Sequence, residues 1–344
     1  MAGYKKIVAS QFGGSEVLQL REFEQLPEPN AGEVRVRVEA AGVGYTDTIV
    51  RRGRYHLYTA GLPLTPGYDM VGVVDKLGEG VTGLKIGERV ADMPVHGSYS
   101  EFIVRPASEL IPVPVGAEPV AAVDVPLMWM TAWQMLTRSV SLTPGEIILV
   151  VGASGAVGRA LVILAQHLGL RVIGSCSAAN MSLVEDLGAT AIDYRRADLL
   201  EGVRSLSDGK GVAAAFDAVG GASWETSWAA LSKGGMLVGY GMQDFLESGA
   251  ASSEAGKQLQ QFNETWNAEG IADGSQRSTT FYDINVRRTS HSDEYRTDAA
   301  YLLEQIANGK LLPPAAEILR LDQAAEAHRR IAEGGLQQRL VICP

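Results

Sequence analysis

The stretch VVGASGAVGRALVILAQHLGLRVIGSC, residues 150–176, places Gly152, Gly155 and Gly158 between an apolar run and a helical pattern. The run IILVV at 147–151 is apolar at every position, as expected for a strand that is covered on both faces. The residues after the glycines have apolar side chains at helical spacing. Because the glycine spacing is GxxGxxG rather than GxGxxG, the motif alone is also compatible with a purely structural turn.

The segments that follow this turn alternate between strand and helix patterns. Further strands are expected at 171–175, 189–192, 212–220 and 235–241, with helical patterns between them. Strands joined by helical crossovers predict a parallel, doubly wound sheet. In that context the glycines allow close backbone approach to a pyrophosphate, and the helix N-terminus supplies unpaired N–H groups. The sequence therefore predicts a nucleotide site at the turn.

Length and composition restrict the class of protein. A chain of 344 residues exceeds the size at which one core stops growing, so two domains are expected. The net charge of −10 disfavours binding to nucleic acid or to a membrane surface. We find no signal peptide and no segment of about 20 apolar residues, so a cytoplasmic protein is expected. Two distant cysteines exclude a disulfide framework and a cysteine-rich zinc site.

The two parts of the chain outside the alternating region have different textures. VRVRV, from Val34, alternates valine and arginine, which predicts a half-buried strand in a β-rich first third, there expected to be a small irregular barrel. Residues 243–279 are rich in Ser, Gly, Gln and Glu, and we interpret them as an excursion such as a mobile lid or a partner-facing arm. Two helices and a final strand close the chain.

Motifs along the whole chain resemble the zinc-independent medium-chain dehydrogenase/reductases, in the quinone oxidoreductase-like branch. These motifs are AAGVGYTDTIVRRGRY, TPGYDMVGVVDKLGEGVTGLKIGERVA, PLMWMTAW, GASGAVG, LGATAIDYR, FDAVGG, GGMLVGYG and EGGLQQRLVICP. The resemblance implies an α/β chain with a GroES-like β-rich catalytic domain over 1–127 and 281–344. It implies a Rossmann domain over 128–280, with the insertion at about 243–279. It also implies a homodimer joined through the sheet edge around 235–241.

The positions that hold zinc in related enzymes are altered here. Zinc-dependent relatives place Cys in the AGV segment and His-Glu after the PG turn, whereas this chain has Gly44 and Tyr68–Asp69 there. We therefore expect no metal. Without a Lewis acid, reduction of an isolated carbonyl is harder, but a quinone or enone accepts hydride and spreads the charge into its own oxygen. The protein then has to position the acceptor and supply a proton.

Tyrosines are the candidate proton donors, because a phenol with a reference pKa of about 10 stays protonated at neutral pH. Tyr55 matches the family position at which a tyrosine commonly faces the substrate, although packing under the loop is an alternative role. Tyr45 and Tyr68 lie close to the former metal-ligand positions. Thr131, in MTAW, resembles the threonine beside the nicotinamide.

The end of the second strand of the alternating region bears on the choice of cofactor. It carries Ser175, Ser177 and Asn180 and no carboxylate, so it does not repel a 2′-phosphate, and NADP is favoured over NAD. Asn180 replaces the usual lysine of the family, which weakens that preference. The resemblance adds Tyr194 beside Arg195, and Arg339 as a basic residue that can reach the NADP phosphate. The candidate cofactor-binding residues are Ser154, Gly155, Ala156, Val157, Gly158, Ser175, Ser177, Asn180, Tyr194, Gly220, Gly239, Tyr240, Gly241 and Arg339.

Together these features predict an NADPH-dependent, zinc-independent oxidoreductase that transfers hydride to a quinone or an α,β-unsaturated carbonyl. An enoyl-thioester reductase is an alternative, in which Arg51, Arg52 and Arg54 line a basic groove. A non-catalytic NADPH-binding protein is the alternative of another class. The expected partner is a small-molecule substrate. Asp47, Asp69 and Asp217 are expected in structural roles, such as turn and strand-end hydrogen bonds.

Overall fold

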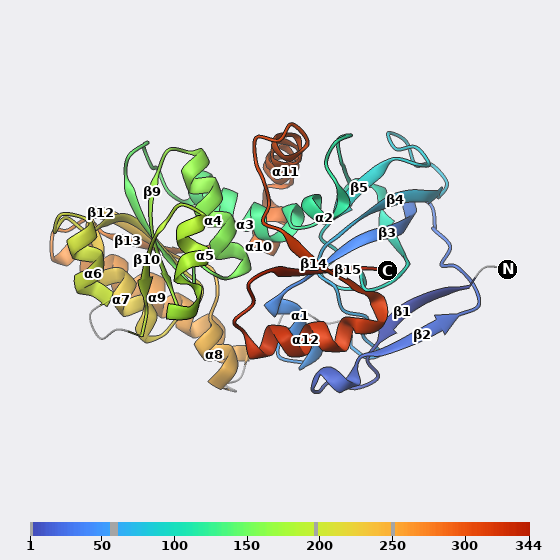
Figure 1. Cartoon of the computed structure of the whole chain (residues 1–344), viewed down its shortest axis with the longest axis horizontal. Coiled ribbons are helices and arrows are strands. Elements are labelled where there is room, and N and C mark those ends of the chain that lie inside the picture. The colour runs from blue at the N-terminus through green and yellow to red at the C-terminus, as the bar shows by residue number, and fades with distance from the viewer. Residues whose placement is uncertain (1–2, 56–60, 196–198, 249–251) are drawn as a thin grey trace. The chain divides into compact units, whose positions relative to one another are not determined.

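The computed structural model describes residues 3–55, 61–195, 199–248 and 252–344. The chain forms two compact units: unit 1 is Met1–Leu127 with Asp293–Pro344, and unit 2 is Met128–Ser292 (Figure 1). Residues 281–292 lie in unit 2, although the sequence analysis assigned them to the returning part of the catalytic domain. The strand Ser278–Phe281 pairs into the sheet of unit 2, and the residues that follow it up to Ser292 stay in that unit.

Unit 1 is organised around one long strand, β3 (Glu33–Val43). It pairs antiparallel with β4 (Met70–Leu77), with β6 (Phe102–Pro106) and with the C-terminal β15 (Arg339–Cys343). In the described part of the chain the strands make a seven-stranded sheet in the order β14-β15-β3-β4-β5-β7, with β6 attached to β3. Because β15 comes from the end of the chain, both ends build unit 1.

The remaining elements of unit 1 are strands, helices and 3₁₀ turns. They are β1 (Tyr4–Val8), β2 (Gln19–Phe23), α1 (Tyr45–Arg51), β5 (Arg89–Asp92), β7 (Ile111–Pro112), α2 (Pro119–Ala122), α11 (Ser292–Ala307), β14 (Ala316–Arg320), α12 (Ala324–Glu333) and the 3₁₀ turns Ser15–Val17, Ala107–Glu109 and Leu321–Gln323.

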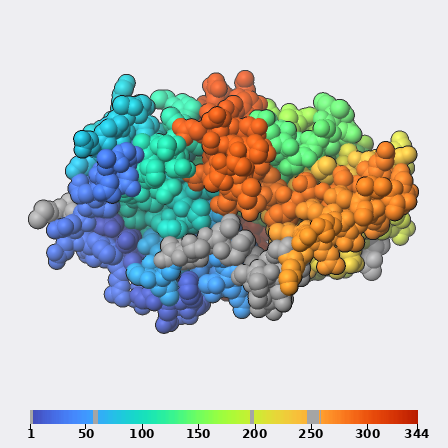
Figure 2. Space-filling model, turned by 180° about the vertical axis from the view of Figure 1, so that it is seen from behind, coloured from blue at the N-terminus to red at the C-terminus, as the bar shows by residue number. Residues whose placement is uncertain are grey.

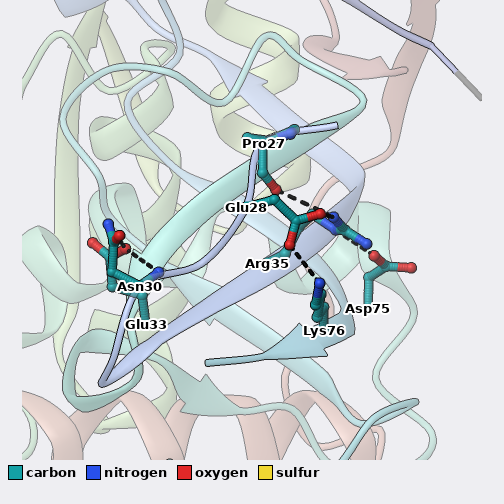
Figure 3. A network of polar contacts seen from close by, with 7 residues as sticks. All are labelled: Pro27, Glu28, Asn30, Glu33, Arg35, Asp75 and Lys76. Carbon is teal, nitrogen blue, oxygen red and sulfur yellow. Dashed lines mark hydrogen bonds and ion pairs between the residues drawn. The ribbon is translucent and has the colours of Figure 1, made fainter. Parts of the chain in front are cut away.

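The valine–arginine alternation of β3 is confirmed. Val34 and Val36 are fully buried in the core of unit 1. On the opposite face, Arg35 is also buried, because its guanidinium donates to Asp75 over 2.5 Å and to Glu28 over 3.1 Å (Figure 3). Arg35 is therefore part of an ionic network that ties the segment before β3 to β4, whereas Arg37 on the same face is exposed.

Unit 2 contains the predicted parallel sheet. Within the described residues it has six strands in the order β10-β9-β8-β11-β12-β13, and every neighbouring pair is parallel. The strands are β8 (Ile147–Val151), β9 (Arg171–Cys176), β10 (Thr190–Asp193), β11 (Val212–Asp217), β12 (Leu231–Gly239) and β13 (Ser278–Phe281). The first five were predicted, and β13 was not.

Helices cover both faces of this sheet, as Figure 1 shows for α4 and α5 on one side and α6, α7 and α9 on the other. Their bounds are α3 (Met130–Gln134), α4 (Ala156–His167), α5 (Met181–Asp186), α6 (Leu199–Leu206), α7 (Ala222–Ala229), α8 (Gln243–Ser248), α9 (Ser252–Ala272) and α10 (Ile284–Ser290), with π-helical turns at Val125–Trp129 and Met135–Ser139 and a 3₁₀ turn at Ala178–Asn180. In the ranges that the structure describes, no helix has the length and apolar character needed to cross a bilayer.

The interpretation of 243–279 as a lid or arm is wrong for the described part of α9. Phe262 is buried and its ring centroid lies 4.1 Å from that of Trp224 on α7. Trp266 stacks on Trp228 at 5.6 Å. The orange atoms of this region form part of the surface of unit 2 in Figure 2. The helix is a structural layer of unit 2, and residues 249–251 of the predicted excursion lie outside the described residues.

The predicted dimer edge also needs correction. Residues 235–241 were expected at the edge of the sheet, but β12 pairs with β11 on one side and with β13 on the other. The register places Met236 opposite Ser278 and Gly239 opposite Phe281. The edge strand on this side is therefore β13.

Candidate functional site

The carboxyl ends of the six strands of unit 2 lie at one edge of the sheet, because all the strands are parallel. The strand order reverses at β8, which has β9 on one side and β11 on the other. In open α/β sheets, ligands bind at such a switch point, outside the carboxyl ends of the strands. Gly152 follows β8 and Asp217 ends β11, so these residues border the switch point of this sheet.

The glycine turn after β8 is as tight as the sequence predicted. Gly152 has φ of +73°, in the left-handed region. The N–H of Gly155 donates to the carbonyl of Gly152 over 2.9 Å. A Cβ on Gly158 would lie 2.2 Å from that same carbonyl oxygen and 2.8 Å from the Cα of Ala153. Gly158 is therefore required for the close packing of α4 on the turn.

Helix α4 begins directly at this turn and presents its N-terminus to the carboxyl edge. Its N-cap is Gly155, and no side chain caps the helix. The first backbone N–H groups of a helix have no partner inside it, so those of Ala156, Val157 and Gly158 face outward. These amides and the helix dipole suit an anionic group such as a pyrophosphate.

Polar groups at the end of β9 lie next to the glycine turn. The N–H of Ala153 donates to the carbonyl of Ser175 over 2.9 Å. Asn180 donates from Nδ2 to the hydroxyl of Ser154 over 3.2 Å. The Oγ of Ser175 is buried and has no hydrogen-bond partner within the described residues. This unused hydroxyl, with Ser177 two residues later, fits a polar ligand at the carboxyl edge.

The positively charged side chain of Arg195 lies just after the next strand, β10. The N–H of Tyr194 donates to the carbonyl of Cys176 over 3.0 Å, which joins this loop to the end of β9. The Tyr194 side chain is half exposed, and the Arg195 guanidinium lies 5.5 Å from its ring centroid. The pair adds a positive charge beside the serines of β9.

Asp217 organises the other side of the switch point. Its buried carboxylate accepts hydrogen bonds from the Val219 N–H at 2.8 Å and from the hydroxyls of Ser223 and Ser227 at 2.6 and 2.7 Å. A fourth hydrogen bond comes from the Gly220 N–H at 3.4 Å. Burial raises the pKa of this carboxyl, and the four hydrogen bonds oppose that shift. The strand-end role expected for Asp217 is confirmed, and the two serines are supporting residues that the sequence analysis missed.

The end of β12 lies against this turn. The N–H of Tyr240 donates to the carbonyl of Asp217 over 3.2 Å. A Cβ on Gly241 would lie 2.7 Å from the Ala218 oxygen, so glycine is needed for this approach. Gly220 has φ of +90°, and burial raises the pKa of the Tyr240 phenol. The candidate cofactor residues of unit 2 therefore gather along one edge.

Thr131 lies on α3, which two further residues anchor to the same edge. The hydroxyl of Tyr282 donates to Oε1 of buried Gln134 over 2.9 Å, and the N–H of Tyr282 donates to the carbonyl of Gly239 over 2.8 Å. The sequence analysis missed Gln134 and Tyr282. The available signal was Gln134 itself, because a polar amide inside the apolar segment PLMWMTAWQML needs a hydrogen-bond partner. The expected role of Thr131 beside the nicotinamide stays a prediction.

Arg339 belongs to unit 1, where its guanidinium is already engaged. It forms a buried ion pair with Asp124 and donates to the carbonyls of Val120 and, over 3.0 Å, of Pro314. These contacts assign the side chain to the packing of unit 1. Its expected contact with the NADP phosphate stays a prediction that no contact in the structure supports.

Two of the three candidate tyrosines of unit 1 lie together. The hydroxyls of Tyr55 and Tyr68 are 2.7 Å apart, and their rings meet edge to face with centroids 6.0 Å apart. Tyr68 is buried and Tyr55 is half-buried. Tyr45 begins α1, where its carbonyl accepts a hydrogen bond from Thr48 over 2.7 Å.

Buried carboxylates fix the loops around these tyrosines. Asp47 accepts from the N–H of Gly44 at 2.9 Å and of Gly67 at 3.1 Å, and burial raises its pKa to about 7. Asp69 accepts from the N–H of Gly42 at 2.9 Å, and burial raises its pKa well above the usual range. Throughout the described ranges, no group of three or more His, Cys, Asp or Glu side chains is placed to hold a metal ion.

A parallel sheet with a glycine-lined helix N-terminus at its switch point defines a nucleotide-binding protein of the doubly wound class. Residues 30–115 match the family model for the alcohol dehydrogenase GroES-like domain, and residues 156–264 match the model for zinc-binding dehydrogenases. The chain belongs to the medium-chain dehydrogenase/reductase superfamily, in its quinone oxidoreductase-like branch.

Individual relatives agree with this assignment. A quinone oxidoreductase of Pseudomonas aeruginosa is 36% identical over 241 residues, which cover 69% of this chain and 73% of the relative. A 2-haloacrylate reductase of Burkholderia is 35% identical over 226 residues, covering 64% and 68%. The crystal structure of Escherichia coli quinone oxidoreductase complexed with NADPH is 27% identical, with a TM-score of 0.85 over 99% of this chain and 100% of that chain.

Proposed function

We propose that this chain is an NADPH-dependent reductase of quinones or α,β-unsaturated carbonyls that works without zinc. The observation that carries the proposal is the uncapped N-terminus of α4 at the switch point, held against the Gly152 turn. The Escherichia coli relative was crystallised with NADPH, and 2-haloacrylate, which the Burkholderia relative reduces by name, contains a conjugated double bond.

The residues along the carboxyl edge of unit 2 divide between the parts of the cofactor. The N–H groups of Ala156, Val157 and Gly158 would bind the pyrophosphate. The loop from Gly239 to Gly241 would bring backbone close to the nicotinamide half, together with Thr131. Bound NADPH would supply hydride, while the protein orients the acceptor and provides the proton.

We propose that the 2′-phosphate of NADPH is bound by Ser175, Ser177, Tyr194 and Arg195. Ser175 offers a buried hydroxyl without a partner among the described residues, and Arg195 supplies the positive charge that Asn180 does not. Arg195→Ala should raise the Kd for NADPH about tenfold or more, because it removes a charged hydrogen bond, and leave the Kd for NADH unchanged. If calorimetry shows that Arg195→Ala weakens the binding of NADPH and of NADH equally, this assignment is contradicted.

The side chains of this chain favour a conjugated acceptor over an isolated carbonyl. No metal-binding cluster occurs in the described residues to polarise an isolated carbonyl, whereas a conjugated acceptor delocalises the incoming charge itself. The tyrosine pair of unit 1 offers the protons that such a reduction needs. A quinone or enone therefore suits the groups present better than a simple ketone does.

The test is the initial rate of NADPH and NADH oxidation with quinones, enones and crotonyl-type thioesters. Quinones and small enones should be reduced, with NADPH preferred. Turnover confined to thioesters would indicate an enoyl-thioester reductase instead. Tight NADPH binding without oxidation by any acceptor would identify a non-catalytic binding protein and overturn the proposal.

We also propose that the protein is a homodimer, as its family resemblance implies. The outermost strand on this side of the sheet is β13 (Ser278–Phe281), since β12 has neighbours on both sides. On its open edge, Thr279 already exchanges backbone hydrogen bonds with the Asn267 side chain of α9, so pairing between sheets would have to displace Asn267. A monomeric wild-type protein in light scattering at micromolar concentration would contradict the proposal.

A further inference from the structure

The hydroxyl of the half-buried Tyr55 contacts the hydroxyl of the buried Tyr68; we call Tyr55 the outer and Tyr68 the inner tyrosine of the pair. Their oxygen atoms are 2.7 Å apart, within the usual range for a hydrogen bond between hydroxyls. Tyr68 is only 1% exposed, whereas Tyr55 is half-buried. Only the outer tyrosine of the pair has part of its surface open to solvent.

The position of Tyr68 is fixed through its backbone. The preceding Gly67 donates its N–H to Asp47 over 3.1 Å, and the N–H of Tyr68 also bonds to that carboxylate. The N–H of Val95 donates to the carbonyl of Tyr68 over 3.1 Å. Gly67 has φ of +105°, and a Cβ there would lie 2.1 Å from the Ser98 hydroxyl. The turn therefore has one arrangement, and it sets the location of the Tyr68 hydroxyl.

Tyr55 reaches this hydroxyl from a different segment. It follows the turn at the end of α1, where the N–H of Gly53 donates to the carbonyl of Val50 over 2.9 Å. Its ring packs against the hydrophobic core of unit 1 and meets the Tyr68 ring at an interplanar angle of 71°. The core contact limits movement of the ring, and the contact with Tyr68 orients the hydroxyl at its end.

We propose that Tyr68 is a positioning residue that holds the hydroxyl of Tyr55 for proton donation to the acceptor, an inference that rests on the proposed function. When hydride adds to the β-carbon of the acceptor, the electron pair of the conjugated double bond moves to the acceptor oxygen. The O–H bond of Tyr55 breaks, and its proton forms the O–H bond of an enol. The phenolate left on Tyr55 takes up a proton from water.

Tyr68 contributes most when Tyr55 carries the negative charge. A hydrogen bond donated to a charged oxygen is about twice as strong as one between neutral groups. The Tyr68 hydroxyl, held by its buried ring and backbone, is already in place to donate to the Tyr55 phenolate. It therefore stabilises the state that follows proton transfer more than the state before it, and it accelerates the step.

The test compares Tyr68→Phe, Tyr55→Phe and the double variant. Tyr68→Phe should lower kcat about tenfold, because a hydrogen bond to a charged group is lost. KM should stay within about twofold, since no binding contact is removed. The alkaline limb of the kcat profile should move up by about one pH unit. The double variant should be no slower than Tyr55→Phe alone, because Tyr68 acts through Tyr55. Additive losses in the double variant would overturn the proposal.

A matched control is Tyr4→Phe, which also removes a hydroxyl from a buried tyrosine of unit 1. The Tyr4 ring packs on Phe23 and Phe102, away from the pair, so this variant should keep the wild-type kcat and pH profile. A merely structural role for Tyr68 would lower stability without moving the alkaline limb.

A measurement without turnover separates this inference from the proposed function. In protein labelled with fluorotyrosine, the fluorine resonance of Tyr55 is identified by its loss in Tyr55→Phe. Its titration midpoint should rise by about one pH unit in Tyr68→Phe. An unchanged midpoint overturns the positioning role, even if the enzyme is active. If the midpoint shifts in Tyr68→Phe but the wild-type protein reduces no acceptor, the effect of Tyr68 on the Tyr55 phenolate is upheld and the proposed function is rejected.

Discussion

Asp124 and Arg339 form an ion pair in which the side chains are only 5% and 9% exposed. Removing one member of a buried pair leaves the other charge desolvated and costs about 3–5 kcal/mol. Arg339→Met should lower the free energy of unfolding by about that amount, and the ratio of the Kd values for NADPH and NADH should not change.

The control for this prediction is Arg320→Met, since Arg320 pairs with Asp322 at 3.0 Å on an exposed surface. Its loss should cost about 1 kcal/mol or less in chemical denaturation. A stable Arg339→Met protein that has lost its preference for NADPH would instead support the phosphate contact implied by the family resemblance.

Gly158→Ala should disrupt the nucleotide turn, because the new Cβ would lie 2.2 Å from the Gly152 oxygen and the backbone would have to move. We expect a loss of about 1–3 kcal/mol in the free energy of unfolding and weaker binding of both nicotinamide nucleotides. The matched control is Gly202→Ala in α6, where the nearest atom would be the flexible tip of Ile192 at 3.3 Å. Unchanged nucleotide affinity in Gly158→Ala would contradict a pyrophosphate site at this turn.

The parallel sheet and the glycine turn were predictable because their signals are local. IILVV is apolar throughout, and glycine spacing and helix pattern follow it directly in the sequence. Strand β13 lacks such a signal, since STTF is short and polar and is defined only by pairing with β12. The polar surface of α9 concealed its buried side, although Phe262 and Trp266 stand four residues apart, at the spacing of one helix face.

The site shows the same division. Ser154 and Gly158 could be predicted as candidates because they belong to one continuous motif. The contact between Tyr55 and Tyr68 joins two segments that are brought together only by the tertiary fold, so sequence reasoning made each tyrosine a candidate but did not pair them. Arg339 was assigned to the NADP phosphate from the family resemblance. The sequence did not indicate its ion pair with Asp124, because Asp124 is distant in sequence and carries no motif of its own.

Asp47 and His328 should give the protein opposing pH dependences of stability. Burial raises the pKa of Asp47 from 3.8 to about 7, so between these values the folded state binds more protons than the unfolded state. Stability due to Asp47 therefore falls as pH rises, by up to about 1.4 kcal/mol per pH unit. Burial, with Arg51 and Arg52 nearby, lowers the pKa of His328 from 6.5 to about 3. Between those values the unfolded state binds the extra proton, so stability due to His328 rises with pH.

The two slopes oppose each other between about pH 4 and about pH 6.5, and single variants should separate them. Relative to the wild type, Asp47→Asn should gain stability as pH rises through this window, and His328→Gln should lose it. The measurement is the free energy of unfolding in urea at a series of pH values. Parallel curves for the wild type and both variants would show that neither group has a shifted pKa in the folded protein.

Phe262→Ala should destabilise the protein strongly if α9 is a structural layer rather than a lid. Phe262 is 5% exposed and lies between Trp224, at 4.1 Å, and Trp266, at 5.3 Å between ring centroids. Truncating a buried phenylalanine costs about 3–5 kcal/mol, because the cavity closes only in part. The control on the same helix is Ile271→Ala, since Ile271 is 80% exposed and its loss should change the free energy of unfolding by about 0.5 kcal/mol or less. If both variants unfold at the wild-type urea concentration, the packing of Phe262 does not contribute to the stability of unit 2.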